Sequence, residues 1–207
     1  MNNCIFTAHC IENMCDKSCP ILVETSYLLE RNGISPTSYL FYDKRVDVPK
    51  ILRLLKRFDG KEGTVIVPSS SSGFNTVQWA EAITYCAICT NWKGNRLHCN
   101  VYNLKFSKYL EDLKQSWNTR SDTEALEYTK IWSDSAKVLI VSNFDYVNFG
   151  DFESQTLLNL LQARQVEGKT TILVSPPLNQ LVSSKSSMFF SMLRSRMNSN
   201  AQEVGRC

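Results

Sequence analysis

Four cysteines near the start of the chain carry the side chains that a metal site needs. Cys4, Cys10, Cys15 and Cys19 have the spacing C-x₅-C-x₄-C-x₃-C, and they account for half of the eight cysteines in the chain. Four thiolates complete the tetrahedral shell that Zn²⁺ prefers, and metal binding contributes about 10–16 kcal/mol to the folding of small zinc-finger peptides. The spacing predicts a zinc-binding module. An Fe–S cluster on the same thiolates is the first alternative, and four reduced thiols without a metal are the second.

A second group, Cys86, Cys89, His98 and Cys99, also contains metal-ligand residue types. Cys86 and Cys89 lie one turn apart in a segment with a helical pattern. Small thiols are common where a helix packs on a sheet, so we favour core packing over ligation here.

The stretch VIVPSSSSGFNTVQW, residues 65–79, has the layout of a phosphate-binding loop. A β-branched run enters a loop of serines and one glycine, and a helical pattern follows. In such loops backbone N–H groups surround the phosphates and a lysine neutralises their oxygens, but this stretch has no lysine. It is therefore a nucleotide site, a degenerate one, or a connector in which Asn75 or Thr76 caps the next helix.

Basic side chains line one side of a predicted amphipathic helix over 48–60. They are Lys50, Arg53, Lys56 and Arg57. A net charge of +3 is too small to indicate nucleic-acid binding by itself. This cluster predicts contact with a single-stranded DNA backbone or with an acidic face of a partner, and a solvated helix face is the alternative.

The composition is typical of a globular domain, with 43% hydrophobic and 21% charged residues. No apolar run approaches the roughly 18 residues of a transmembrane helix, and the first residues lack the pattern of a secretory signal. We therefore expect a cytoplasmic protein without a membrane partner.

Strands and helices alternate from residue 63 onward. Two helices, 21–33 and 48–60, come before them. We expect strands at 63–68, 96–104, 137–145 and 170–176, and helices at 75–92, 105–117, 121–135, 152–168 and 186–197. Strands regularly separated by helices indicate an α/β fold with a mostly parallel sheet covered on both faces.

In this order of elements, residues 48–197 resemble the ATPase domain of DnaC/DnaI-type replicative helicase loaders, a branch of the AAA+ superfamily. The segment DSAKVLIVSNFD, residues 134–145, stands where that family has its Walker B strand. The segment LLNLLQARQVEGKTTILVSPPLNQL, residues 157–181, resembles the next helix, a glycine turn and the sensor-1 strand. The resemblance implies a parallel-sheet P-loop/AAA+-like domain.

The resemblance aligns 69–76 with the Walker A loop, and the match there is degenerate. Thr76 falls at the Mg²⁺ position and Asn75 at the lysine position, while Ser72 takes a glycine position and Phe74 that of the last glycine. Together with Gly73, residues 72, 75 and 76 are what remains of a nucleotide-binding loop. Asn75 can donate a hydrogen bond but brings no charge.

The Walker B positions have also lost their chemistry. Ser142 and Asn143 stand where two acidic residues are needed for Mg²⁺ and for the attacking water. Asp145 comes two residues too late, although a shifted loop would bring it in. Because the sensor-1 position falls at 175–176, a serine and a proline, three sites differ together, which argues against hydrolysis. Weak nucleotide binding and genuine ATPase activity remain the alternatives.

Arg194 and Arg196 lie in the last predicted helix. The resemblance implies that either one is a candidate arginine finger, lent to a neighbouring subunit in an oligomer.

Some DnaI-type loaders carry a zinc-stabilised N-terminal domain that grips the helicase. The resemblance therefore implies a partner-docking module at 1–47, a degenerate AAA+-like domain at 48–197, and a polar tail at 198–207. We expect a DNA-replication accessory protein, of a phage or mobile element, that binds a replicative helicase or another replisome protein as a pseudo-ATPase. The alternatives are an active ATP-dependent loader with an atypical P-loop and an inhibitor that mimics the host loader.

Overall fold

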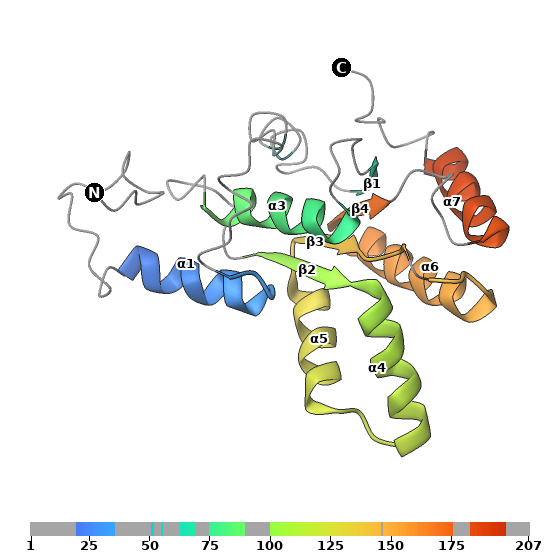
Figure 1. Cartoon of the computed structure of the whole chain (residues 1–207), viewed down its shortest axis with the longest axis horizontal. Helices are drawn as coiled ribbons and strands as arrows, with labels where there is room; N and C mark the ends of the chain where they lie inside the picture. The colour runs from blue at the N-terminus through green and yellow to red at the C-terminus, as the bar shows by residue number, and fades with distance from the viewer. Residues whose placement is uncertain are drawn as a thin grey trace.

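A four-stranded parallel sheet forms the centre of the protein (Figure 1). The computed structural model describes residues 20–35, 51, 55, 63–68, 75–89, 100–145, 147–175 and 183–197. The strands are β1 (Gly63–Pro68), β2 (Val101–Lys105), β3 (Val138–Ser142) and β4 (Thr170–Ser175), and their order across the sheet is β1-β4-β3-β2. Every neighbouring pair is parallel, which confirms the predicted parallel sheet.

The helices follow the predicted order with small shifts at their ends. They are α1 (Pro20–Arg31), α3 (Thr76–Cys89), α4 (Phe106–Thr119), α5 (Glu124–Ser135), α6 (Asp151–Val166) and α7 (Ser184–Met197). The predicted helix 121–135 begins late because Thr123, whose hydroxyl accepts from the N–H of Leu126, is its N-cap. None of the described helices is long and apolar enough to cross a membrane.

The two faces of the sheet bury separate hydrophobic clusters. The connection from β1 to β2 runs across the sheet in one direction, and the connections through β3 to β4 run back. Right-handed crossovers then place the helices on opposite faces. Helix α3 packs its Trp79, Ile83 and Cys86 on one face, together with the helical, buried Ile51 and Leu55.

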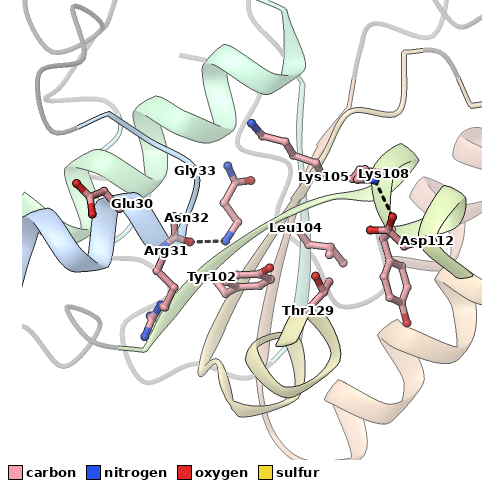
Figure 2. Close-up of a pocket in the computed structure, with 12 residues that line it drawn as sticks. Glu30, Arg31, Asn32, Gly33, Tyr102, Leu104, Lys105, Lys108, Asp112 and Thr129 are labelled. Carbon is pink, nitrogen blue, oxygen red and sulfur yellow. Dashed lines mark hydrogen bonds and ion pairs between the residues drawn. The ribbon is translucent and has the colours of Figure 1, made fainter. Parts of the chain in front are cut away.

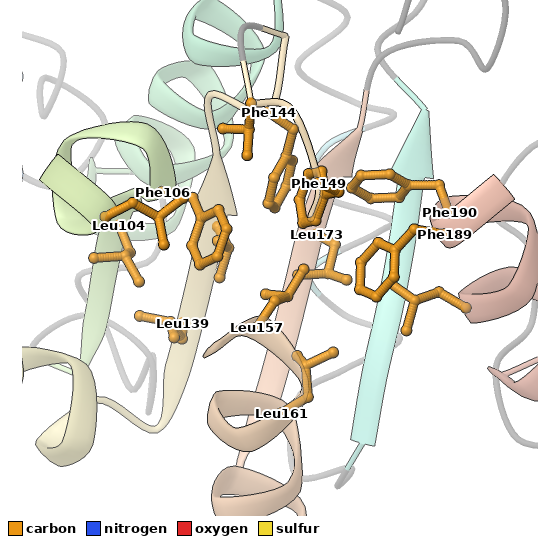
Figure 3. Close-up of a cluster of buried hydrophobic side chains, with 14 residues drawn as sticks. Leu104, Phe106, Leu139, Phe144, Phe149, Leu157, Leu161, Leu173, Phe189 and Phe190 are labelled. Atoms are coloured by element: carbon orange, nitrogen blue, oxygen red, sulfur yellow. The ribbon is translucent and has the colours of Figure 1, made fainter. Parts of the chain in front are cut away.

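The opposite face is covered by side chains of α4, α6 and α7, together with residues of the segment that follows β3 (Figure 3). Aromatic rings fill its upper part. Phe149 stacks on Phe189 with 4.7 Å between ring centroids, and Phe144 meets Phe190 edge-on at 5.2 Å. Such pairs contribute about 0.5–1.5 kcal/mol beyond their buried area, so this cluster fixes the segment that follows β3.

Helix α1 packs against α3 and reaches the outer edge of β2. Gly33, with a φ of +68°, ends the turn that follows the helix, as the sequence predicts. Asn32 is buried and accepts a hydrogen bond from the backbone N–H of Asn103 at 2.7 Å. The described part of the 1–47 segment therefore contacts the α/β domain directly, and the boundary at residue 47 stays a prediction.

A buried arginine joins the amino-terminal ends of the strands. The Arg164 side chain of α6 donates to the carbonyl oxygens of Ser133 and Thr170, both at 2.7 Å, and to that of Lys137 at 3.3 Å. It also donates to the Thr171 hydroxyl at 2.9 Å. Burial lowers the pKa of the Arg164 guanidinium to about 10, so the group remains charged at neutral pH.

Replacing this guanidinium should destabilise the fold. Arg164→Met keeps the apolar stem and leaves buried carbonyl oxygens without a donor, so we expect a loss of about 3 kcal/mol in the free energy of unfolding. Gln162→Met, on the exposed side of the same helix, should change it by less than about 0.5 kcal/mol. Urea unfolding followed by circular dichroism measures both, and equal effects would contradict the structural role of Arg164.

Candidate nucleotide site

The candidate site lies at the carboxyl ends of the strands. In open α/β sheets ligands bind there, at the point where the chain direction across the sheet reverses. In this fold β1 leads to α3 on one face, while its neighbour β4 leads toward α7 on the other. The start of α3 and the residues after β3 meet at this edge, where the resemblance expects a nucleotide.

Asn75 caps helix α3. Its side-chain oxygen accepts from the N–H of Gln78 at 2.8 Å, and its own N–H donates to the Gln78 side chain at 3.1 Å. The Asn75 carbonyl accepts the first helical hydrogen bond, from Trp79, at 3.1 Å. This reciprocal arrangement is a capping box. It uses two of the N–H groups that a phosphate at a helix N-terminus would need.

The sequence contains a pattern that predicts this cap. An Asn followed three residues later by a Gln, just before an apolar run, predicts a capping box. Of the two predicted caps, Asn75 and Thr76, the structure selects Asn75, and the role of Gln78 was not predicted.

Thr76 and Asp145 meet across this edge of the sheet. Thr76 is fully buried, and its hydroxyl donates to Oδ2 of the Asp145 carboxylate. The structure thus brings together the residue at the Mg²⁺ position and the acidic residue that follows β3. They contact each other directly, so each uses a group that a metal ion would otherwise contact.

A left-handed turn after β3 explains how Asp145 reaches this place. Asn143 has a φ of +64°, a conformation that asparagine adopts more readily than most residues. Its side-chain amide donates to the hydroxyl of Ser107 in α4, while Phe144 is fully buried. The predicted strand 137–145 therefore stops at Ser142, and the turn re-aims the chain so that Asp145 faces α3.

The remaining candidate residues that the structure describes lie at the ends of β3 and β4 and in α7. Ser142 is buried and donates to the Asn103 side chain at 3.4 Å. Ser175, at the end of β4, is also buried. Arg194 and Arg196 lie in the last turn of α7. Outside the described residues lie Ser72, Gly73, Phe74 and Pro176.

These residues do not fit Mg²⁺–nucleotide. The lysine position is a helix cap, the threonine hydroxyl is buried against a carboxylate, and the two Walker B positions bind neutral side chains. Nothing in this set offers the positive charge that the β- and γ-phosphates need. In the described part of this site, the polar groups of Asn75 and Gln78 satisfy each other, as do those of Thr76 and Asp145.

The predicted metal ligands Cys4, Cys10, Cys15 and Cys19 lie outside the described residues, so the zinc site stays a prediction. Within the described ranges, no group of three or more His, Cys, Asp or Glu side chains is placed to hold a metal ion.

Cys86 is buried in the hydrophobic cluster under α3. Burial raises the pKa of its thiol to about 12, and a protonated thiol is not a metal ligand. The structure thus supports the predicted core packing of this residue.

The basic cluster Lys50, Arg53, Lys56 and Arg57 also lies outside the described residues. Ile51 and Leu55, which the sequence assigns to the apolar face of the same helix, are helical and buried.

Comparison with known proteins yields a likeness to a solved structure. No family model and no curated protein matches the chain. Among solved structures, the chain is similar to domain III of the replication initiation protein DnaA from Thermotoga maritima, with 15% identity and a TM-score of 0.49. The likeness covers 81% of this chain and 64% of that one, so the chain spans less than two thirds of the length of its neighbour. The fold assignment rests on the strand order given above.

The Thr76–Asp145 contact can be measured by a double-mutant cycle. Thr76→Val keeps the shape and removes the donor, and Asp145→Asn removes the charge of the acceptor. Because a hydrogen bond to a charged group contributes about 1.5–3 kcal/mol, we expect a coupling of about 2 kcal/mol in the free energy of unfolding. Additive effects of the two substitutions would show that the side chains do not interact in solution.

Proposed function

We propose that this protein acts by contact, as a helicase-loader-like accessory protein of DNA replication that hydrolyses little or no ATP. Its partner would be a replicative helicase or another replisome protein, with single-stranded DNA as a second ligand. The AAA+-like assignment of residues 48–197 belongs to this proposal.

The observation that carries the proposal is the closure of the candidate nucleotide site. The Asn75–Gln78 capping box and the Thr76–Asp145 hydrogen bond are complete without a ligand. A nucleotide would have to break these bonds and replace them without a lysine. Such a site offers little net binding energy, because each broken bond to a buried group must be compensated.

The link to replication comes from the order of elements and from the segment 137–181. The strand β3, the helix α6, the glycine turn at Gly168 and the strand β4 occur in the order that the helicase-loader resemblance expects. The predicted zinc module at 1–47 agrees with a docking role, since some DnaI-type loaders use such a module to grip the helicase.

One observation favours the rival function, an active ATPase with an atypical P-loop. The Thr76 hydroxyl and the Asp145 carboxylate lie side by side, and they belong to the residue types that hold Mg²⁺ in P-loop enzymes. Nucleotide titration therefore separates the two functions.

Labelled ATP with Mg²⁺, titrated against the purified full chain, should bind with a dissociation constant weaker than about 1 mM. No turnover above the background of the Thr76→Ala variant is expected. Robust hydrolysis that Thr76→Ala abolishes would contradict the proposed action by contact and would show that the protein is an active ATP-dependent loader.

Partner capture tests the docking role. Affinity purification from the native host, followed by mass spectrometry, should enrich a replicative helicase or another replisome protein. Cys15→Ser should lose both this capture and the bound metal, expected as about one equivalent of zinc. Thr76→Val should retain the capture, since no nucleotide is needed.

Absence of replisome proteins from the captured set would contradict the proposal. Where a helicase is captured, a helicase-loading assay shows whether the bound protein promotes or blocks loading. Stimulated loading supports the accessory role, and blocked loading by the host loader supports the inhibitor instead.

A further inference from the structure

The outer edge of β2 carries main-chain N–H and C=O groups that form no hydrogen bond to another strand in the described structure. The N–H of Val138 donates to the carbonyl of Asn100 at 3.0 Å, and peptide groups alternate in direction along a strand. The N–H and C=O groups of Val101, Asn103 and Lys105 therefore point away from β3. Strand β2 lies at the end of the described sheet order.

The side chain of Asn32 already occupies the first part of this edge. Its oxygen accepts from the N–H of Asn103 at 2.7 Å, and its nitrogen lies 3.5 Å from the carbonyl oxygen of Val101. Arg31 donates to the same carbonyl at 3.1 Å. A side-chain amide thus sits where a peptide group of another strand would sit. This contact shows that the edge of β2 can bond to an amide group.

The next pair of groups along the edge is open. Among the described residues, no hydrogen bond is made to the Asn103 carbonyl or by the Lys105 N–H. A groove of about 260 Å³ runs along this part of β2 (Figure 2), and its lining includes Gly33, Tyr102, Lys105, Lys108, Tyr109 and Asp112. Gly33 adds no side chain to the groove, so a chain segment can approach the strand.

The rim of the groove presents positive charge. Lys105 pairs with Glu81 at 3.2 Å, and Lys108 pairs with Asp112 at 2.7 Å. In both pairs the cation is the more exposed partner, with side-chain exposures of 37% against 20% and of 64% against 9%. Glu30 is an exposed carboxylate at the α1 end. A ligand near Lys105 and Lys108 therefore meets ammonium groups before carboxylates.

We infer that this groove binds an extended acidic peptide segment of a partner protein, which adds to β2 as a further strand. The inference rests on the proposed function, because it names a surface through which a contact-acting protein would hold its partner. The main chain of the peptide accepts from the Lys105 N–H and donates to the Asn103 carbonyl, as in other cases of strand addition. Acidic side chains of the peptide lie against Lys105 and Lys108.

A single substitution removes the donor that the inference needs. Lys105 has a φ of −80° at the N-cap of α4, which proline can adopt, and an edge position tolerates proline. Lys105→Pro therefore deletes both the N–H and the lysine side chain. Lys105→Ala removes the ammonium group with its methylene stem but keeps the N–H, and it is the matched control. Circular dichroism and thermal unfolding check that both variants fold.

The probe is a set of acetylated, amidated heptapeptides that alternate valine with Glu, Gln or Lys. Fluorescence anisotropy with the full chain should show tightest binding for the Glu peptide. Lys105→Ala should weaken that binding by at most about fivefold, as expected for an exposed charge. Lys105→Pro should weaken it by at least about tenfold, and N-methylation of the peptide backbone should abolish it.

Equal affinities of Lys105→Pro and Lys105→Ala would overturn the inference, as would equal binding of the Glu and Lys peptides. Self-association that Lys105→Pro abolishes, without peptide binding, would make a second copy of the chain the occupant and would also overturn it. Failure here leaves helicase capture by the native chain intact. If that capture fails while peptide binding is retained, the proposed role in replication is wrong, and the groove is still a peptide-binding site.

Discussion

The hydrogen bonds of one buried guanidinium set the position of both central strands. Arg164 reaches from α6 to the carbonyl oxygens of Ser133, Lys137 and Thr170 at the amino-terminal edge of the sheet. Burying a positive charge is costly unless its donors are satisfied, and here they bind groups from α5, the start of β3 and β4. Because β3 and β4 are fixed at this edge, their carboxyl ends, at Ser142 and Ser175, lie together at the opposite edge.

That opposite edge is satisfied in another way, by neutral and acidic side chains that bind one another. The capping box of Asn75 and Gln78 and the contact of Thr76 with Asp145 use local donors and acceptors instead of a ligand's oxygens. Active phosphate sites leave such donors free for the ligand. The left-handed turn at Asn143 is part of this closure, because without it the chain after β3 would not turn toward α3.

Periodicity located nearly every described element, since the strands and helices bury regular faces. It did not reveal the end of β3, because an apolar run gives no sign that Asn143 takes a positive φ. The same limitation hid the position of Asp145. Periodicity also cannot predict the order of the strands in the sheet. It reports which residues are buried and carries no information about which strands are neighbours. Asn32 looks like an ordinary helix-end residue in the sequence, and only the fold shows it against the edge of β2.

The contacts that stabilise α3 lie on the sheet and not at its N-terminus. Helix α3 buries Trp79, Ile83 and Cys86 against the sheet, so its loss would expose a whole face of the core at about 1.5–3 kcal/mol for each large side chain. The phosphate-binding residues of a P-loop, by contrast, sit in the loop before the helix and contribute to the ligand rather than to the core. Asn75 adds a cap to α3 at the position where such a loop would carry its lysine. These contacts hold α3 on the sheet without a basic side chain at position 75 or acidic side chains at positions 142 and 143. The contact function proposed above requires no ligand at this edge.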